Sequence, residues 1–176
     1  MKTQLIEAGC HAGNMKLKMN FWNNLMAFSF VWSVTLILLG IWWYLDFDEG
    51  LLFAGGIFHL VLSVPAVYLH IEYFIRNMGL EVEIYPDRII VKYKNQWEEY
   101  FTNELEKIIL YKAANAGNMQ FTGMEGYHFA KVITKSGRKI IITNLMTTKL
   151  EKAVQILNDV PYEREKFFFC STFFWK

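Results

Sequence analysis

The residue types that usually carry chemistry in proteins are few in this chain, and they are far apart. The four histidines share no spacing typical of a metal site: His11, His59, His70 and His128. The two cysteines, Cys10 and Cys170, lie near opposite ends and form no CxxC pair. This distribution predicts reduced thiols rather than a disulfide framework.

The acidic residues also lack the arrangement of a catalytic pair. Glu81 and Glu83 alternate with apolar residues, as in a strand with one face toward solvent. The adjacent Glu98 and Glu99 fall in another such segment. The glycines of GNMQFTG (117–123) lack the strand, lysine and helix of a phosphate-binding loop. We therefore predict no enzyme activity, cofactor, metal or small-molecule substrate.

Composition narrows the possible partners. The formal net charge of +1 at pH 7 gives no general attraction to nucleic acid. Hydrophobic residues make up 53% of the chain and aromatic residues 17%, which indicates contact with a membrane. We expect a lipid bilayer and a protein as partners, and no nucleic acid.

Two long apolar stretches are the candidates for that contact. LMAFSFVWSVTLILLGIWWYL (25–45) contains no charged residue, and LLFAGGIFHLVLSVPAVYLHI (51–71) contains no acid, lysine or arginine. A helix needs about 20 apolar residues to cross the hydrocarbon core of a bilayer. The sequence therefore predicts a two-helix transmembrane hairpin within residues 22–76.

The residues that flank these stretches predict their orientation. The connector DFDEG carries three acids and no base, and Arg76 follows the second stretch. The lysines before the first stretch are Lys2, Lys16 and Lys18. Because positive residues favour the cytoplasmic side, we expect a multi-pass protein of the cell (inner) membrane. The N-terminal segment 1–21 and the C-terminus would then be cytoplasmic.

Small and polar residues recur on one side of each stretch at spacings of three and four. Such residues let membrane helices approach closely and form hydrogen bonds. The predicted hairpin contact contains Ser29, Ser33, Gly40, Gly56, His59, Ser63 and Ala66. For His59, an imidazole bonded to Ser29, Ser33 or a backbone carbonyl is a simpler interpretation than a proton relay. Pro65 is expected to kink the second helix.

From residue 80 onward, apolar residues alternate with period two, which predicts strands joined by short turns and therefore antiparallel pairing. The expected strands are LEVEIY (80–85), RIIVKYK (88–94), WEEYFT (97–102), LEKIILYK (105–112), YHFAKVIT (127–134) and KIIIT (139–143), with a weaker one around 119–121.

The period becomes helical in TTKLEKAVQILNDV (147–160). Four apolar residues share one face of this helix: Leu150, Ala153, Val154 and Leu157. Thr148 and Glu151 have the spacing of a capping box. An open sheet of six to seven strands would leave exposed edges, so we expect a partly open barrel closed by the helix. This cytoplasmic domain would cover residues 80–160.

Two spans followed at once by such a domain resemble the bacterial pleckstrin-homology-like membrane proteins. The resemblance runs from Leu25 to about Val160. It rests on LEVEIYPDRIIVKYKNQWEEYFTNELEKIILYK and KSGRKIIITNLMTTKLEKAVQIL, and FTNELEKI is similar to an IPYSEI segment of that family. The resemblance implies an α-helical transmembrane hairpin plus a PH-like α+β domain, and it carries over no catalytic residue.

Eukaryotic relatives of this fold bind inositol phosphates through basic residues in the first hairpin loop. Here that loop is Pro86-Asp87, with Arg88 beside it, and it is too short for a basic cradle. A milder basic group lies in KSGRK, whose possible lipid headgroup contacts are Lys135, Arg138 and Lys139. A solvated turn is the simpler alternative.

The last segment, 161–176, is an aromatic tail that follows the closing helix. Its FFFCSTFFWK sequence is too short to cross a membrane as a helix. The tail could be an interfacial anchor, a strip laid on the barrel, or a docking peptide for a partner, and the anchor is favoured. The interfacial residues would be Phe167, Phe168, Phe169, Phe173, Phe174 and Trp175.

Together these features predict a non-catalytic, membrane-anchored PH-like module. It would mediate protein–protein interaction or self-assembly as a homo-oligomer at the cytoplasmic face of the membrane. Two alternatives stay open: a domain that binds or senses anionic lipid, and an accessory subunit of a transporter or secretion complex.

Overall fold

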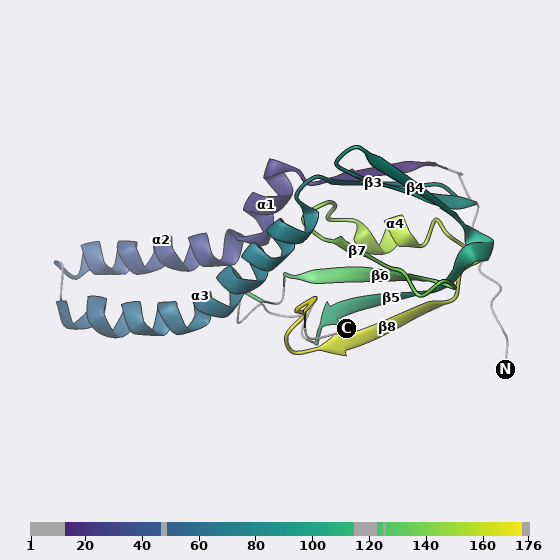
Figure 1. Ribbon diagram of the computed structural model, residues 1–176. Helices are drawn as coiled ribbons and strands as arrows, with labels where there is room; N and C mark the ends of the chain where they lie inside the picture. Colours follow the sequence, from purple (N-terminus) through teal and green to yellow (C-terminus); the bar gives the residue numbers. More distant parts are fainter. Residues whose placement is uncertain (1–12, 47–48, 115–122, 125, 174–176) are drawn as a thin grey trace, which may run out of the picture.

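The computed structural model describes residues 13–46, 49–114, 123–124 and 126–173, which form two four-stranded sheets and a helical hairpin (Figure 1). The strand order is β1-β2-β3-β4 in the first sheet and β7-β6-β5-β8 in the second. The helices project from one end of the paired sheets, so the molecule is elongated. The weak strand expected around 119–121 lies outside the described residues.

The first sheet joins a strand that precedes the helices to three that follow them. It contains β1 (Met15–Lys18), β2 (Leu80–Ile84), β3 (Arg88–Tyr93) and β4 (Gln96–Phe101), all antiparallel. Lys18 at the end of β1 lies opposite Glu81 in β2. The whole helical hairpin is therefore inserted between two adjacent strands of one sheet. The N-terminal segment contributes to the domain, which extends beyond the predicted range of 80–160.

The second sheet has one strand that runs against the predicted pattern. β5 (Leu105–Ala113), which follows the 3₁₀ turn η1 (Thr102–Glu104), pairs antiparallel with β6 (His128–Thr134), and β6 pairs with β7 (Lys139–Thr143). β8 (Tyr162–Phe167) pairs parallel to β5, so the prediction of antiparallel strands alone is wrong here.

The direction of β8 follows from where the chain returns to the sheet. The Ile108 N–H donates to the Pro161 carbonyl at 2.8 Å, beside the start of β5. β8 begins there and must run in the direction of β5. Both arrowheads point toward the helices in Figure 1. The first part of the predicted tail segment, 161–176, is therefore an edge strand.

The second sheet is buried on both faces, which ties the domain to the helices. On its inner face, Ile108 and Leu110 of β5 pack in a core shared with the first sheet. On its outer face, Ile109 and Tyr111 belong to a second apolar cluster. That cluster also contains helix residues, including Ala66, Leu69 and Tyr73, which are fully buried. Alternate side chains of β5 therefore pack in two different hydrophobic cores.

The helices differ in detail from the two predicted spans. The first predicted span, 25–45, is divided into α1 (Phe21–Ala27) and α2 (Ser29–Tyr44), with a bend of 56° at Phe28. α3 (Glu49–Asn77) runs through Pro65 without a break. Its Leu52–Asn77 stretch is long and apolar enough to cross a membrane, and α1 with α2 passes the same test only as a bent pair.

The closing helix is shorter than expected. α4 (Leu150–Val154) begins after Lys149, and turns follow it as far as Val160. The capping box of Thr148 and Glu151 does not form, because the Glu151 carboxylate instead binds cations of the second sheet. The apolar face is as predicted: Leu150, Ala153, Val154 and Leu157 are all buried in the core between the sheets.

Candidate functional site

The end of the domain that adjoins the helices carries a basic pocket. Its volume is about 260 Å³, and it lies where α3 gives way to β2, beside the β3–β4 turn. The residues that line it are Lys18, Met19, Asn77, Gly79, Leu80, Glu81, Lys92 and Lys94. The pocket therefore combines three cationic side chains with one carboxylate, close to the last residue of a long apolar helix.

Three different elements position the three lysines. Lys18 ends β1, and Lys92 lies on β3, directly opposite Glu81 of the intervening strand. Lys94 occupies the β3–β4 turn with a φ of 55°, a left-handed conformation that is unusual for a lysine. Its N–H donates to the Gly79 carbonyl at 3.1 Å, which joins the turn to the end of α3. The pairing of the strands thus gathers cations that are distant in sequence.

Glu81 neutralises only part of this charge. Its carboxylate lies 2.6 Å from the Lys18 ammonium, and the hydrogen bond from Lys18 is the main cause of the lowered pKa of Glu81. The Lys92 ammonium lies 4.6 Å from the centre of the Trp97 ring, and that of Lys94 lies 5.5 Å from the centre of Tyr93. The arrangement can accept an anionic group beside aromatic rings.

The predicted headgroup contacts in KSGRK lie elsewhere. The turn that follows β6 is beside η1, because the Lys135 N–H donates to the Glu104 carbonyl at 2.8 Å. This is the end of the domain farthest from the helices (Figure 1). Arg138 also pairs with Glu98 at 2.6 Å, and Lys139 is exposed at the start of β7. The turn itself therefore lies away from the helices, but Arg138 and Lys139 line a pocket of about 310 Å³ with Arg76 of α3. A headgroup contact at these three residues stays a prediction.

The predicted helix contact is only partly the one that forms. His59, Ser63 and Ala66 of α3 face the protein, whereas Gly56 is exposed. In α2, the predicted Ser29, Ser33 and Gly40 are exposed, and a Cβ at Gly40 or Gly56 would meet nothing within 4 Å. The contact instead uses the neighbouring helical stripe of Val31, Thr35 and Leu38, with Gly55 of α3 against the Leu38 side chain.

His59 bonds to hydroxyls within the hairpin. The Thr35 Oγ1 atom lies 2.9 Å from His59 Nε2, and Ser63 Oγ lies 3.2 Å from Nδ1. The expected kind of partner is present, but it is Thr35 and not Ser29 or Ser33, since those two lie on the outer face. The geometry holds the imidazole between α2 and α3.

The aromatic tail is partly packed on the molecule. Phe167 and Phe169 are half-buried against the second apolar cluster, and Cys170 is buried, which raises the pKa of its thiol to about 12. Phe168 and Phe173 remain 71% and 44% exposed. Phe174 and Trp175 lie outside the described residues. The described part of the tail is thus partly laid on the protein, as in the strip interpretation, and the interfacial anchor stays a prediction.

The end of the tail closes over a buried carboxylate of α3. Glu72 is 3% exposed, and its Oε1 accepts bonds from the Thr172 N–H and hydroxyl and from the Phe173 N–H. The Ser171 hydroxyl donates to Oε2 at 2.8 Å. The Tyr73 hydroxyl donates to the Cys170 carbonyl at 2.6 Å. We call residues 170–173 with Glu72 the tail clip. Of these residues, only Phe173 was among the predicted site residues, as an interfacial side chain.

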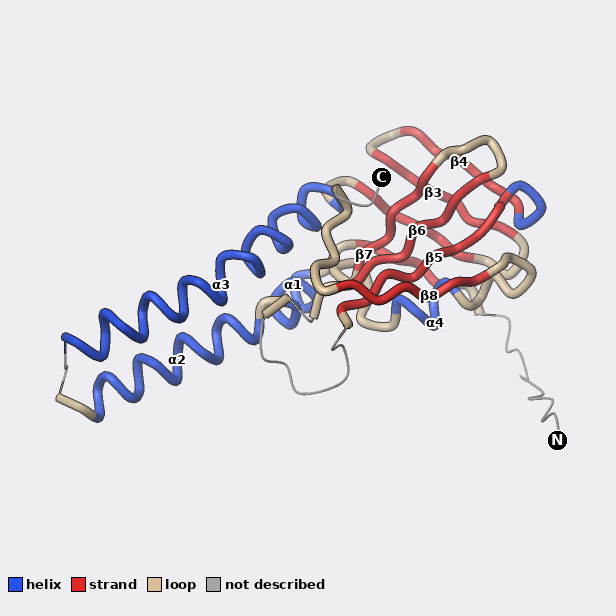
Figure 2. Tube along the Cα trace, turned by 90° about the horizontal axis from the view of Figure 1, so that it is seen from below, coloured by secondary structure: helices blue, strands red, loops and turns tan. Residues whose placement is uncertain are grey.

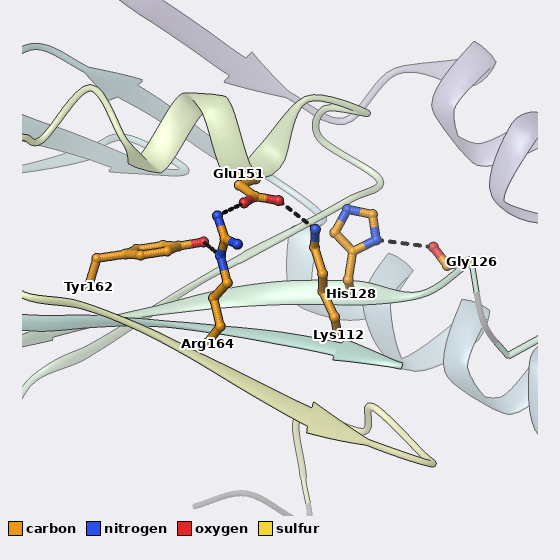
Figure 3. Close-up of polar contacts among 6 residues, drawn as sticks. All are labelled: Lys112, Gly126, His128, Glu151, Tyr162 and Arg164. Atoms are coloured by element: carbon orange, nitrogen blue, oxygen red, sulfur yellow. Dashed lines mark hydrogen bonds and ion pairs between the residues drawn. The ribbon is translucent and has the colours of Figure 1, made fainter. Parts of the chain in front are cut away.

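A second polar cluster joins α4 to the second sheet (Figure 3). Glu151 of α4 binds both Lys112 of β5 and Arg164 of β8. His128 lies beside them on β6, and burial lowers its pKa to about 4. Each cation is drawn to the carboxylate between them, so the cluster acts as a structural clamp. In the described part of the chain, no group of three or more His, Cys, Asp or Glu residues could hold a metal ion.

Comparison with known proteins identifies a family. The sequence model of the PH domain family matches residues 12–153, from just before β1 into α4. No curated protein matches the chain. The family match covers most of the chain and includes the first sheet, the inserted helices and strands β5 to β7 of the second sheet. The chain therefore belongs to the PH domain family.

Proposed function

We propose that this protein is a non-catalytic PH-like module that is anchored in the cell membrane by its helical hairpin and binds anionic lipid headgroups. The basic pocket at the helix-facing end of the domain carries the proposal. Lys18, Lys92 and Lys94 meet there at the point where the apolar α3 ends. A pocket in that position would lie at the level of the lipid phosphates.

The lengths of the helices support the anchoring. α3 has 29 residues and would be about 43 Å long, more than the roughly 30 Å of the hydrocarbon core. Most of its apolar side chains are exposed, including Phe53, Phe58 and Leu60, which are 72%, 63% and 62% exposed. Such a surface is unfavourable in water and suited to lipid. The acidic tip between α2 and α3 would face away from the cytoplasm.

Charge supports an anionic ligand. Three ammonium groups against one carboxylate leave the pocket cationic, and each lysine near an anionic surface contributes about 1 kcal/mol. The aromatic rings beneath Lys92 and Lys94 hold these side chains at the rim of the pocket. The ligand class is a phospholipid with a net negative headgroup.

The chain offers a matched pair of variants for the test. One replaces Lys18, Lys92 and Lys94 by Ala, and the control replaces Lys135, Arg138 and Lys139 by Ala. Both remove three positive charges, but the control takes them from the β6–β7 turn and the start of β7, where Arg138 and Lys139 line another pocket with Arg76. Binding of a fluorescent short-chain phosphatidylglycerol to the full chain in neutral detergent is measured by anisotropy. We expect the first variant to bind at least about tenfold more weakly and the control to bind as the wild type does.

The salt dependence is a further check, because added salt screens exposed charges. Wild-type binding should weaken as salt rises, and the variant without the pocket lysines should respond less. Equal losses in both variants would show attraction to overall charge and would refute the pocket as the site.

A second candidate function, recognition of a protein or of another copy of the chain, is favoured by the β4 edge. Within the described residues, β4 pairs only with β3, so its outer edge is open to backbone pairing. Trp97 and Phe101 on this strand are 56% and 45% exposed. The lipid assay separates the candidates: a module that recognises protein alone would show no dependence on the pocket lysines. The role of an accessory subunit in a larger complex would use the same edge.

A further inference from the structure

The short helix α1 exposes its apolar side chains and turns polar ones toward the protein, which is the reverse of a surface helix in water. Phe21, Trp22 and Met26 are 73%, 65% and 65% exposed, whereas Asn23 and Asn24 are half-buried toward the rest of the protein. The Asn24 amide donates to the Asn20 carbonyl at 2.7 Å. A helix on a soluble domain would place its apolar side chains inward. The outward face of α1 therefore requires an apolar neighbour.

The position of α1 identifies that neighbour. The helix departs from α2 by 56° at Phe28, whose ring lies 5.0 Å from the ring of His70 in α3. Phe28 and His70 are therefore at the same depth. From Gly50 to His70, α3 rises about 30 Å, which is the thickness of a hydrocarbon core. The bend between α1 and α2 thus falls at the boundary between hydrocarbon and headgroups, and α1 begins to lie along that boundary.

A second apolar group reaches the same depth from the tail. Phe169 stacks on Tyr68 of α3 with a centroid separation of 5.9 Å. Tyr68 is two residues from His70, so the adjacent Phe168, which is 71% exposed, lies near the same boundary. Cations lie just beyond it, and the Arg76 guanidinium is 4.6 Å from the centre of the Phe173 ring. Aromatic side chains with cations beside them are typical of the membrane interface.

We propose that α1 and the tail turn at Phe168 lie in the interfacial layer of the lipid bilayer and hold the domain against the membrane surface. The occupant of the outward face of α1 is thus the headgroup and upper acyl region of a phospholipid leaflet. The proposal rests on the membrane anchoring proposed above. It adds that α1 does not continue the span begun by α2 but lies toward the membrane plane.

Depth-dependent quenching of a fluorescent probe tests this in the full chain. In a background with Cys10→Ser and Cys170→Ala, one cysteine is introduced by Met26→Cys, Phe168→Cys, Leu36→Cys or Asp87→Cys and labelled with an environment-sensitive dye. All four sites are exposed, so the fold should be kept. The protein is placed in phosphatidylcholine vesicles that carry a spin label either near the headgroup or near the middle of the acyl chain.

The two proposals make different predictions for the four sites. The dye at Leu36, on the outer face of α2, should be quenched most by the deep label. The dyes at Met26 and Phe168 should be quenched about twofold more by the shallow label than by the deep one. The dye at Asp87, at the far end of the domain, should be quenched by neither.

The outcomes distinguish the inference from the anchoring. If the Leu36 dye is quenched but the Met26 and Phe168 dyes behave as the Asp87 dye does, α1 and the tail turn do not contact lipid. The inference is then refuted and the anchoring stands. Deep quenching at Met26 would place α1 inside the span and would also refute the inference. If the Leu36 dye is not quenched, the anchoring fails and the inference fails with it.

Discussion

At the scale of single residues, His128 gives the domain a definite response to pH. Its Nδ1 atom lies 3.3 Å from the Gly126 carbonyl, and Lys112 lies nearby on the adjacent strand. Burial is the main cause of the lowered pKa of His128, about 4 against an ordinary value of 6.5. The unfolded chain therefore binds a proton at a pH where the folded domain still excludes it.

The sign of the effect follows from this difference. Above pH 6.5 the imidazole is neutral in both states, and its contribution to stability is fully present. As pH falls from 6.5 toward 4, the unfolded state gains the proton first and the folded state is destabilised, by about 2 kcal/mol near pH 5. The lowered pKa of Glu151, caused mainly by its bond from Lys112, adds a loss only at lower pH, around and below 4.5.

The variant His128→Gln tests this prediction, because its amide can still donate to the Gly126 carbonyl but does not titrate. Thermal unfolding of the full chain in detergent is followed at pH 7.5 and at about pH 5. The wild type should lose several degrees more than the variant between these two values. The comparison at pH 7.5 is the control for any direct effect of the substitution. An identical pH dependence for both proteins would contradict the prediction.

At the scale of elements, the strands that were predictable are those whose pattern is local. β7 is a short run of β-branched residues and occupies the expected 139–143, and β5 extends the expected 105–112 by one residue. β1 has only four residues and forms because β2 pairs with it after a long insertion. Nothing within MKLK distinguishes it from a flanking basic segment. β8 was missed for a similar reason, since its partner β5 lies far away in sequence.

The candidate site was less predictable than the fold. The periodicity identified a face of small and polar residues on each helix. A shift of one residue selects a neighbouring face, however, and the residue that faces α2 is Gly55 rather than Gly56. The pocket lysines come from β1, β3 and a turn, so their proximity depends on strand register. The charge of KSGRK was visible in the sequence, but its distance from the helices depended on the direction of β6.

The tail clip gives a prediction about how elements are held together. Glu72 accepts the backbone N–H groups of Thr172 and Phe173, so its removal should release the tail from α3. In Glu72→Ala, hydrogen exchange of these two amides should accelerate by about tenfold or more, because their buried hydrogen bonds to the side chain are lost. The measurement is exchange followed by mass spectrometry on the full chain in detergent.

A carboxylate elsewhere on the tail segment is the matched control. Glu163 of β8 forms an exposed ion pair with Lys107 at 3.2 Å, and exposed pairs contribute little. Glu163→Ala should therefore leave exchange in the tail unchanged. Should Glu72→Ala also leave it unchanged, the tail would be held by its half-buried aromatic side chains, and the clip would be incidental.

At the scale of the whole molecule, the hairpin and the domain form one packed unit. The chain enters the first sheet at β1, leaves for the helices and re-enters at β2, and the tail then crosses α3. Figure 2 shows the helices meeting the ends of the strands where these connections gather. The second apolar cluster combines side chains of α2, α3, the second sheet and the tail. Movement of the hairpin should therefore be transmitted to the domain.

Weakening strand β1 is the most direct test of whether the hairpin and the domain form one packed unit. Leu17 is 1% exposed and packs in the core between the sheets, although it precedes the helices in sequence. Leu17→Ala should destabilise the domain by about 3 kcal/mol, because it removes buried apolar surface and leaves a cavity. For a domain of this size, the unfolding temperature in detergent should fall by about 10 °C.

Lys16→Ala on the same strand is the control, since Lys16 is largely exposed and its pairs with Glu81 and Glu83 are on the surface. Equal and small effects of the two substitutions would mean that β1 is an accessory strand, and that the domain is joined to the hairpin chiefly through α3.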